Sequence, residues 1–194
     1  MRRVIVFGVP RSGTSWIGQI LNSAPSVAYR FQPIHAHTFS ASLGQDSSLP
    51  EVRRFFQLLV STSDPYVLQE DGFTLGGRSP SFMKASPTHV VFKEVHDYAA
   101  LENATKVDPT VSLVGIVRNP VDVMTSWLNS PREFDASWSF EDEWFEAERK
   151  NAEYAGNCFG FKRWLETTHK LIRLSRDLPE QVVLISYDRF RSKP

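Results

Sequence analysis

One junction in the sequence most constrains the fold: an apolar strand that leads directly into a glycine turn and then into a helix. Residues 4–7 are a continuous β-branched and aromatic run, which predicts a strand buried on both faces. Gly8 and Gly13 bound the turn that follows. Residues 14–21 carry an apolar stripe at helical spacing, and Pro25 ends this helix. This order of elements is typical of a parallel α/β sheet with a phosphate-binding loop.

Strands and helices continue to alternate along the chain. Further strands are predicted at residues 90–95, 111–117 and 182–185, and further helices at 52–60, 119–128, 141–154 and 161–174. Residues 71–87 are rich in glycine, serine and proline, which predicts a long irregular segment. The alternation predicts an α/β fold: a three-layer sandwich with a mainly parallel central sheet, like that of P-loop nucleoside triphosphatases, in a single domain over residues 1–194.

The charge balance limits the partners of the protein. The 194 residues include 22 basic and 22 acidic side chains, which argues against a nucleic-acid or anionic membrane partner. Any bound anion must therefore be held by local geometry. The single cysteine, Cys158, permits no intrachain disulfide and no thiolate zinc site, and it is interpreted as an inert, partly buried small hydrophobe. The apolar run at residues 4–7 is too short for an export signal or a membrane span, so a cytoplasmic location is expected.

The glycine turn has the features of an anion cradle. Gly8 and Gly13 have G-x-x-x-x-G spacing, so backbone N–H groups of the turn and of the next helical turn point at one anion. Further polar donors surround the turn: Arg11, Ser12, Thr14 and Ser15. Thr14 stands where nucleotide hydrolases have lysine, and no apolar strand ends in the aspartate that would complete a magnesium site. A metal-dependent ATPase or GTPase is therefore the weaker interpretation, as is a turn without a ligand.

A second anion site is predicted where the strand at residues 111–117 ends. Arg118 follows directly, and Asn119 is a good N-cap for the next helix. Ligands bind at the carboxyl ends of parallel strands, and a guanidinium can grip a phosphate with two hydrogen bonds. Ser126 returns to nearly the same helix face roughly 10 Å along the axis, so it and Arg118 can contact one group. The alternative is that Arg118 pairs with Asp122 and Ser126 merely packs.

Together these two motifs resemble those of the sulfotransferase family, which uses 3′-phosphoadenosine 5′-phosphosulfate (PAPS). Residues 9–16 (VPRSGTSW) are similar to the family's 5′-phosphosulfate loop, and residues 117–126 (VRNPVDVMTS) to its 3′-phosphate motif. Residues 183–190 (VLISYDRF) resemble its later strand and turn more weakly. The resemblance implies a sulfotransferase fold, PAPS as co-substrate, 3′,5′-adenosine bisphosphate (PAP) as product, and no metal.

The resemblance also implies how the donor is held. The residues assigned to the phosphosulfate are Arg11, Ser12, Gly13, Thr14 and Ser15, and those assigned to the 3′-phosphate are Arg118 and Ser126. Trp16 stacks on or flanks adenine, and Tyr187 reaches it; the alternative for either side chain is a place in the core.

Sulfuryl transfer to a hydroxyl or amine is the reaction that the resemblance implies. Arg11 occupies the family's basic position, which stabilises charge on the leaving nucleotide. Many members have Lys-x-His at a strand end; here Lys93 is followed by Glu94 and, one residue later than in the family, by His96. Strand alternation places Lys93 and Val95 on one face and Glu94 and His96 on the other if the strand continues that far. His96 is the first candidate for the general base, Glu94 the second, and an exposed polar strand end the alternative.

The acceptor is expected to be a small molecule or a carbohydrate. Gln32 stands where relatives often have glutamate, which leaves His35 and His37 as further candidate bases. The aromatic, acidic stretch at residues 127–145 either lines an acceptor site or packs around the preceding helix. Family members usually continue with a loop that closes over the donor, so the chain is expected to lack this closing segment or to be naturally short. The alternative functions are a P-loop kinase or nucleotide hydrolase with a degenerate motif, and a nucleotide-binding module without catalysis.

Overall fold

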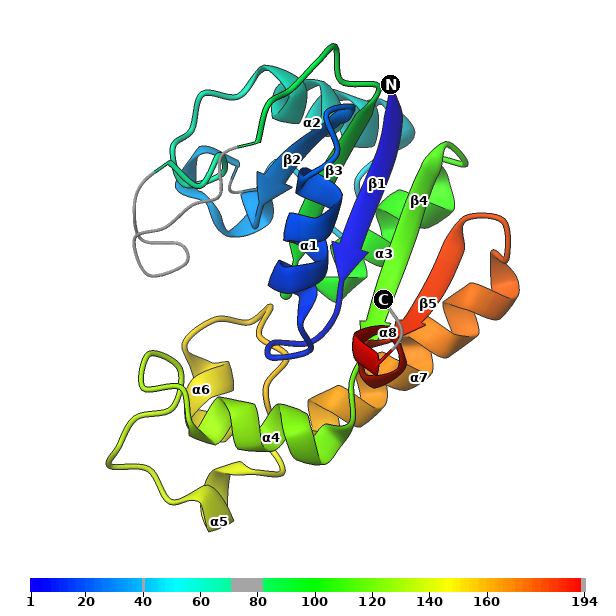
Figure 1. Ribbon diagram of the computed structural model, residues 1–194. Helices are drawn as coiled ribbons and strands as arrows, with labels where there is room; N and C mark the ends of the chain where they lie inside the picture. The colour runs from blue at the N-terminus through cyan, green and yellow to red at the C-terminus, as the bar shows by residue number, and fades with distance from the viewer. Residues whose placement is uncertain (40, 71–81, 193–194) are drawn as a thin grey trace.

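A sheet of parallel strands carries the site. The computed structural model describes residues 1–39, 41–70 and 82–192. The strands are β1 (Arg2–Phe7), β2 (Val27–Phe31), β3 (His89–Glu94), β4 (Val111–Val117) and β5 (Val182–Ser186). They lie in the order β2-β3-β1-β4-β5, and each pairing in the described part of the chain is parallel (Figure 1). Phe7 pairs with Glu94 of β3 and with Gly115 of β4, so the carboxyl ends of the three central strands meet at one edge.

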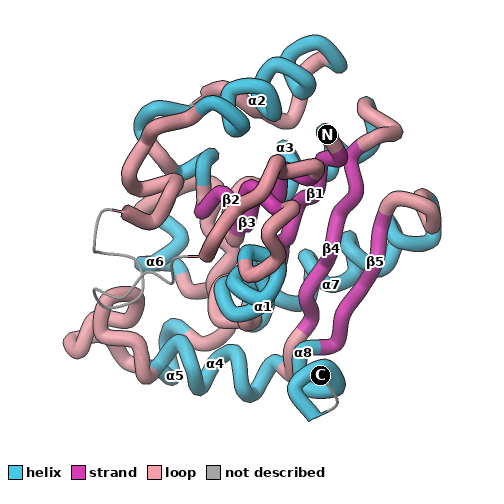
Figure 2. The backbone as a smooth tube through the Cα atoms, turned by 45° about the horizontal axis from the view of Figure 1, so that its top comes forward, coloured by secondary structure: helices cyan, strands magenta, loops and turns pink. Residues whose placement is uncertain are grey.

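Helices cover both faces of the sheet, which makes three layers. The helices of the outer layers are α1 (Thr14–Asn22), α2 (Leu49–Ser61), α3 (Tyr98–Val107), α7 (Gly160–Asp177) and α8 (Tyr187–Ser192). α1 and α8 pack on one face through a buried cluster that includes Val6, Ile17 and Ile116. α2, α3 and α7 pack on the other face through a larger cluster that includes Phe56 and Leu101 (Figure 2). The predicted α/β sandwich with a parallel central sheet is confirmed.

The remaining helices lie beyond the carboxyl ends of the strands (Figure 1). They are α4 (Pro120–Leu128), α5 (Phe140–Glu143) and α6 (Glu148–Ala152). A third buried cluster, which includes Trp127, Phe134 and Phe159, joins this part of the chain. Trp127 Nε1 also donates a hydrogen bond to the Glu133 carbonyl oxygen at 3.1 Å. Much of the aromatic stretch at residues 127–145 therefore packs in this cluster, beyond the carboxyl ends of the strands.

The predicted helix at residues 141–154 is wrong, because the chain breaks into α5 and α6. Ala147 adopts a positive φ of 51° between the two helices. The carbonyl oxygens of Trp144 and Phe145 accept hydrogen bonds from the N–H groups of Phe161 and Lys162 at 2.8 and 3.0 Å. Because those two carbonyls are bonded to the start of α7, they do not continue an α-helical ladder.

Besides α8 and the short 3-10 helices Pro33–His35 and His37–Phe39, the elements β2 and α3 are absent from the sequence-based prediction. β2 is short, and Arg30 interrupts its apolar run; in the structure Arg30 Nε donates to the Leu59 carbonyl oxygen at the end of α2 at 2.6 Å. α3 begins after Asp97, which has a positive φ of 55° and makes no side-chain cap. Both elements therefore lack the local signal that a sequence reading uses. Of the predicted irregular segment, residues 82–87 form neither helix nor strand, and residues 71–81 lie outside the described residues.

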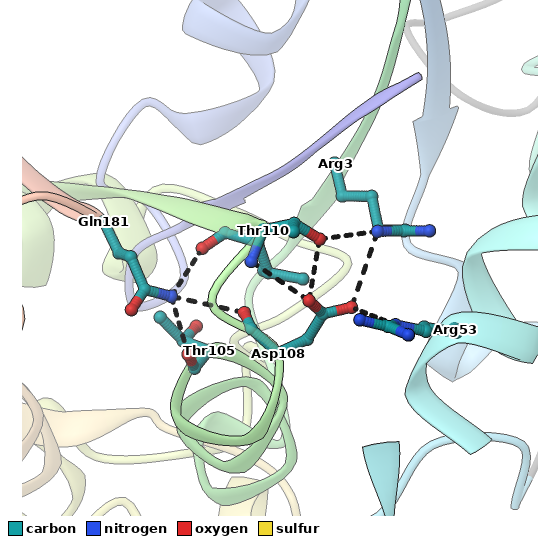
Figure 3. A network of polar contacts seen from close by, with 7 residues as sticks. Arg3, Arg53, Thr105, Asp108, Thr110 and Gln181 are labelled. Carbon is teal, nitrogen blue, oxygen red and sulfur yellow. Dashed lines mark hydrogen bonds and ion pairs between the residues drawn. The ribbon is translucent and has the colours of Figure 1, made fainter. Parts of the chain in front are cut away.

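The opposite edge of the sheet is fastened by a buried carboxylate. The Asp108 side chain is fully buried and lies 3.5 Å from Arg3 of β1 and 3.3 Å from Arg53 of α2 (Figure 3). It also accepts a hydrogen bond from the Thr110 hydroxyl at 2.7 Å. Gln181 Nε2 donates to the carbonyl oxygens of Asp108 and two neighbouring residues, which ties the start of β5 to the same point (Figure 3).

None of the helices in the described ranges is long and apolar enough to cross a membrane.

Candidate active site

The turn between β1 and α1 forms an open cradle of N–H groups. Arg11 and Gly13 both adopt left-handed backbone conformations, with φ of 69° and 88°. The first helical N–H bonded within the cradle is that of Ile17, which donates to the Gly13 carbonyl oxygen at 3.2 Å. The N–H groups at the very start of α1 have no partner in the helix itself. No acidic side chain lies in its first turn and no side chain caps it. The helix start is therefore available to an anion.

The two predicted anion sites meet through direct hydrogen bonds. Arg118 Nη1, from the end of β4, donates to the Arg11 carbonyl oxygen at 3.0 Å. Arg11 Nε donates to Ser126 Oγ of α4 at 3.1 Å. Arg118 thus makes contact with the cradle, which is not the alternative in which it pairs with Asp122. Its Nε is buried and has no hydrogen-bond partner among the described residues, so it retains an unused donor.

The start of α4 is capped as predicted, with one difference. Asn119 Oδ1 accepts from the Val121 N–H at 2.9 Å, which confirms Asn119 as the N-cap. The N–H of Asn119 donates to Asp188 Oδ2 of α8 at 3.1 Å. In a capping box this donor would meet the acidic side chain at Asp122 instead. The start of α4 is therefore anchored by the chain that follows β5.

Tyr187, at the start of α8, contacts residues of both predicted anion sites. Its ring lies 4.8 Å from the Arg118 guanidinium carbon and 5.6 Å from the Trp16 ring, in an edge-to-face arrangement. A Cβ at Gly13 would lie 2.2 Å from the Tyr187 ring. Trp16 is 40% exposed and also packs on Phe190 of α8. The aromatic pair Trp16 and Tyr187 thus borders the cradle on the side of α1 and α8.

A cavity of about 740 Å³ lies above the cradle and extends to the ends of β2 and β3. Its lining includes nearly all of the predicted site residues: Arg11, Gly13, Thr14, Ser15, Trp16, Gln32, His35, Lys93, His96, Arg118 and Ser126. Ser12, Glu94 and Tyr187 do not line it. Ser12 is fully buried within the turn, and its hydroxyl has no partner among the described residues. His37 lines a separate, smaller cavity beside Asp64 and Tyr66.

The end of β3 supplies a buried cation and a neutral imidazole to this cavity. Lys93 is 3% exposed, and its Nζ lies 4.6 Å from the centre of the Phe31 ring. Burial lowers the pKa of Lys93 to about 8. β3 ends at Glu94, and the bend that follows brings His96 to the cavity together with Lys93. Burial, with the nearby charges of His35 and Lys93, lowers the pKa of His96 to about 3, so its imidazole is neutral.

His96 belongs to a small cluster of rings. It stacks on His35 at 5.1 Å between ring centres, and Tyr154 meets both rings edge-on at 5.6 and 5.9 Å. The Tyr154 hydroxyl donates to Asp97 Oδ2 at 2.7 Å, which fixes the tyrosine ring. Glu94 is fully buried outside the cavity, and its Oε1 accepts from the Val95 N–H at 2.9 Å. Burial raises the pKa of Glu94 to about 7.

Several lining residues were not singled out from the sequence. They are Gln19 from α1, Tyr66, Glu133 and Phe159. Glu133 is the most consequential, because its Oε1 lies 3.7 Å from Arg11 Nη1. It stands inside the aromatic, acidic stretch, and only its proximity to α4, which carries Ser126, could have drawn attention to it.

Cys158 lies away from these groups. Burial raises the pKa of its thiol to about 11, which fits a cysteine with no nucleophilic role.

The chain is similar to known proteins in sequence and in structure. The chain matches the family described as the sulfotransferase domain over residues 1–194. A solved sulfotransferase from Alicyclobacillus acidocaldarius has 17% sequence identity and a TM-score of 0.55, with 100% of this chain and 76% of that chain covered. A mouse sulfotransferase in complex with PAP has 12% identity and a TM-score of 0.52, with 99% of this chain and 54% of that chain covered. At these identities the likeness is one of fold. A search of curated proteins finds no match.

Proposed function

Because the chain belongs to the sulfotransferase family, we propose that it transfers the sulfuryl group of PAPS to a hydroxyl or amine of a small-molecule or carbohydrate acceptor. The observation that carries the proposal is the contact between the two cationic motifs. Arg118 Nη1 donates to the Arg11 carbonyl oxygen at 3.0 Å, and both residues line one cavity. A nucleotide with anionic groups at both ends of adenosine needs two such sites at a fixed separation.

Hydrogen-bond donors without a protein acceptor are available to bind PAPS. The N–H groups at the start of α1 and the Arg118 Nε atom have no protein acceptor among the described residues. We assign the cradle of Arg11, Gly13, Thr14 and Ser15 to the 5′-phosphosulfate, with Ser12 buried beneath it, and Arg118 and Ser126 to the 3′-phosphate. Trp16 borders the adenine, and Tyr187 supports Trp16 and Arg118 from behind.

Each charged side chain then has a task in the reaction. Sulfuryl transfer develops negative charge on the oxygen that leaves with the nucleotide, and Arg11 stabilises this charge. A guanidinium stays protonated, so Arg11 acts by its charge and its hydrogen bonds alone. Lys93 and His96 line the same cavity near the ends of β2 and β3, and we assign this part of it to the acceptor. His96 presents a neutral ring that orients the acceptor by a hydrogen bond.

Two measurements test the proposed function. In calorimetry, PAP is expected to bind without magnesium and more tightly than ATP with magnesium; preference for ATP–magnesium would indicate a kinase or hydrolase. Incubation with ³⁵S-labelled PAPS and a panel of hydroxyl and amine acceptors is expected to yield a labelled product. Tight PAP binding with no transfer to any acceptor or to water would instead indicate a nucleotide-binding module.

A further inference from the structure

Among the described residues that line the cavity, Glu133 is the only one with a carboxylate side chain. Its backbone is held on both sides: its N–H donates to the Ser130 carbonyl oxygen at 2.9 Å, and its own carbonyl oxygen accepts from Trp127 Nε1 at 3.1 Å. Trp127 is 1% exposed, so this anchor belongs to the packed core below α4. The position of Glu133 is therefore set by the fold.

The carboxylate of Glu133 interacts with two cations. Its Oε1 is 3.7 Å from Arg11 Nη1, and its negative charge also acts on the buried Lys93. Its Oε2 is buried and has no hydrogen-bond partner in the described part of the chain. One oxygen thus meets the residue assigned to the leaving group, and the other is an unused acceptor.

Two of the other candidate bases, Glu94 and His96, are less suited to take a proton. Glu94 does not line the cavity. His96 is buried beside Lys93 and stacks on His35, so a second positive charge there is opposed by its surroundings.

We propose that Glu133 is the general base of the transfer; this inference rests on the proposed function. The Glu133 carboxylate, whose side chain is 31% exposed and lines the cavity, accepts the proton of the acceptor hydroxyl while the acceptor oxygen forms its bond to sulfur. The bond between sulfur and the bridging oxygen of the 5′-phosphate breaks, and its electron pair stays on that oxygen, beside Arg11. Protonation removes the negative charge of Glu133, so Arg11 loses its competing partner as the leaving oxygen gains charge. Proton uptake and leaving-group stabilisation are thus coupled through one ion pair.

Glu133→Gln tests this role with little change of shape. With the hydroxyl acceptor that the wild type uses best, kcat is expected to fall by about 100-fold or more, because a general base contributes roughly that much. PAP affinity, measured by calorimetry, is expected to stay the same or to rise, since a negative charge beside an anion is removed. Glu141→Gln, an exposed carboxylate of the same stretch, is the control for the loss of one charge.

A series of phenols of graded acidity gives a second readout. Acidic phenols are already ionised and need no base, so the deficit of the Glu133→Gln variant is expected to shrink as the phenol becomes more acidic. A kcat within about threefold of wild type on a weakly acidic hydroxyl would overturn the role of Glu133 alone. A rate that falls only in step with PAP affinity would also overturn it. A wild type that neither binds PAP nor transfers sulfuryl would overturn the proposed function and this inference with it.

Discussion

Gly13→Ala is expected to disrupt the donor cradle through Tyr187. Gly13 has φ of 88°, a left-handed conformation that costs an L-residue about 1–2 kcal/mol. A Cβ at this position would also lie 2.2 and 2.4 Å from two carbons of the Tyr187 ring. Relieving such a clash in packed surroundings costs about 1–3 kcal/mol. We therefore expect Gly13→Ala to lower the free energy of unfolding by about 2–5 kcal/mol. The Tyr187 ring also lies 4.8 Å from the Arg118 guanidinium carbon. Its displacement should therefore disturb Arg118 and lower the affinity for PAP.

A double-mutant cycle separates the two contributions. In a Tyr187→Ala background the clash is absent, and Gly13→Ala should cost only the backbone term of about 1–2 kcal/mol in urea denaturation. Gly44→Ala is the control, because a Cβ there would meet only Ser47 Oγ at 4.0 Å, and its effect should stay within about 0.5 kcal/mol. Strictly additive effects of the Gly13 and Tyr187 substitutions would refute the reasoning, since they would mean that the ring does not restrict the cradle.

Three further predictions follow from the charged residues. Arg118→Ala should weaken PAP binding by about 10–100-fold while AMP binding changes little; equal losses in calorimetry would contradict its assignment to the 3′-phosphate. Burial raises the pKa of Glu94 from 4.5 to about 7. The folded protein therefore keeps a proton that the unfolded chain has lost, stability falls as pH rises through this interval, and Glu94→Gln should remove that fall in urea denaturation. Asp108→Ala should lower the free energy of unfolding by about 3 kcal/mol, because this carboxylate is buried. Arg53→Ala should lower it by less than about 1 kcal/mol, because the Arg53 side chain is half exposed. Equal effects would show that burial of the carboxylate is unimportant.

The positions of Arg11 and Arg118 could be predicted because both residues lie next to strong local signals. The β1 run and the two glycines place Arg11 at a strand end, and the β4 run with the Asn119 cap places Arg118 at the neighbouring one. In a parallel sheet such ends meet at one edge. The structure brings these two residues into contact at that edge.

The rest of the cavity could not be predicted to the same extent because its residues come from elements without local signals. β2 contains Arg30, whose charge is satisfied only by the end of α2. Glu133 belongs to a stretch whose fold depends on Trp127 and on the start of α7, far along the chain. The face occupied by His96 depended on where β3 ends, which strand alternation alone does not determine. Contacts between distant segments decide all three.

The central strand of the sheet is made before either of its partners. β1 pairs with residues 89–94 and 111–117, so during synthesis it must wait for both. At roughly 5–20 residues per second this wait is on the order of ten seconds, during which Ile5, Val6 and Phe7 have no sheet to join. Such pairing between distant segments makes folding slow and exposes an apolar strand edge to aggregation. The cradle forms equally late, because Gly8 packs against Ile116 of β4 and Gly13 packs against the Tyr187 ring. The part of the site encoded first is thus among the last to take its shape.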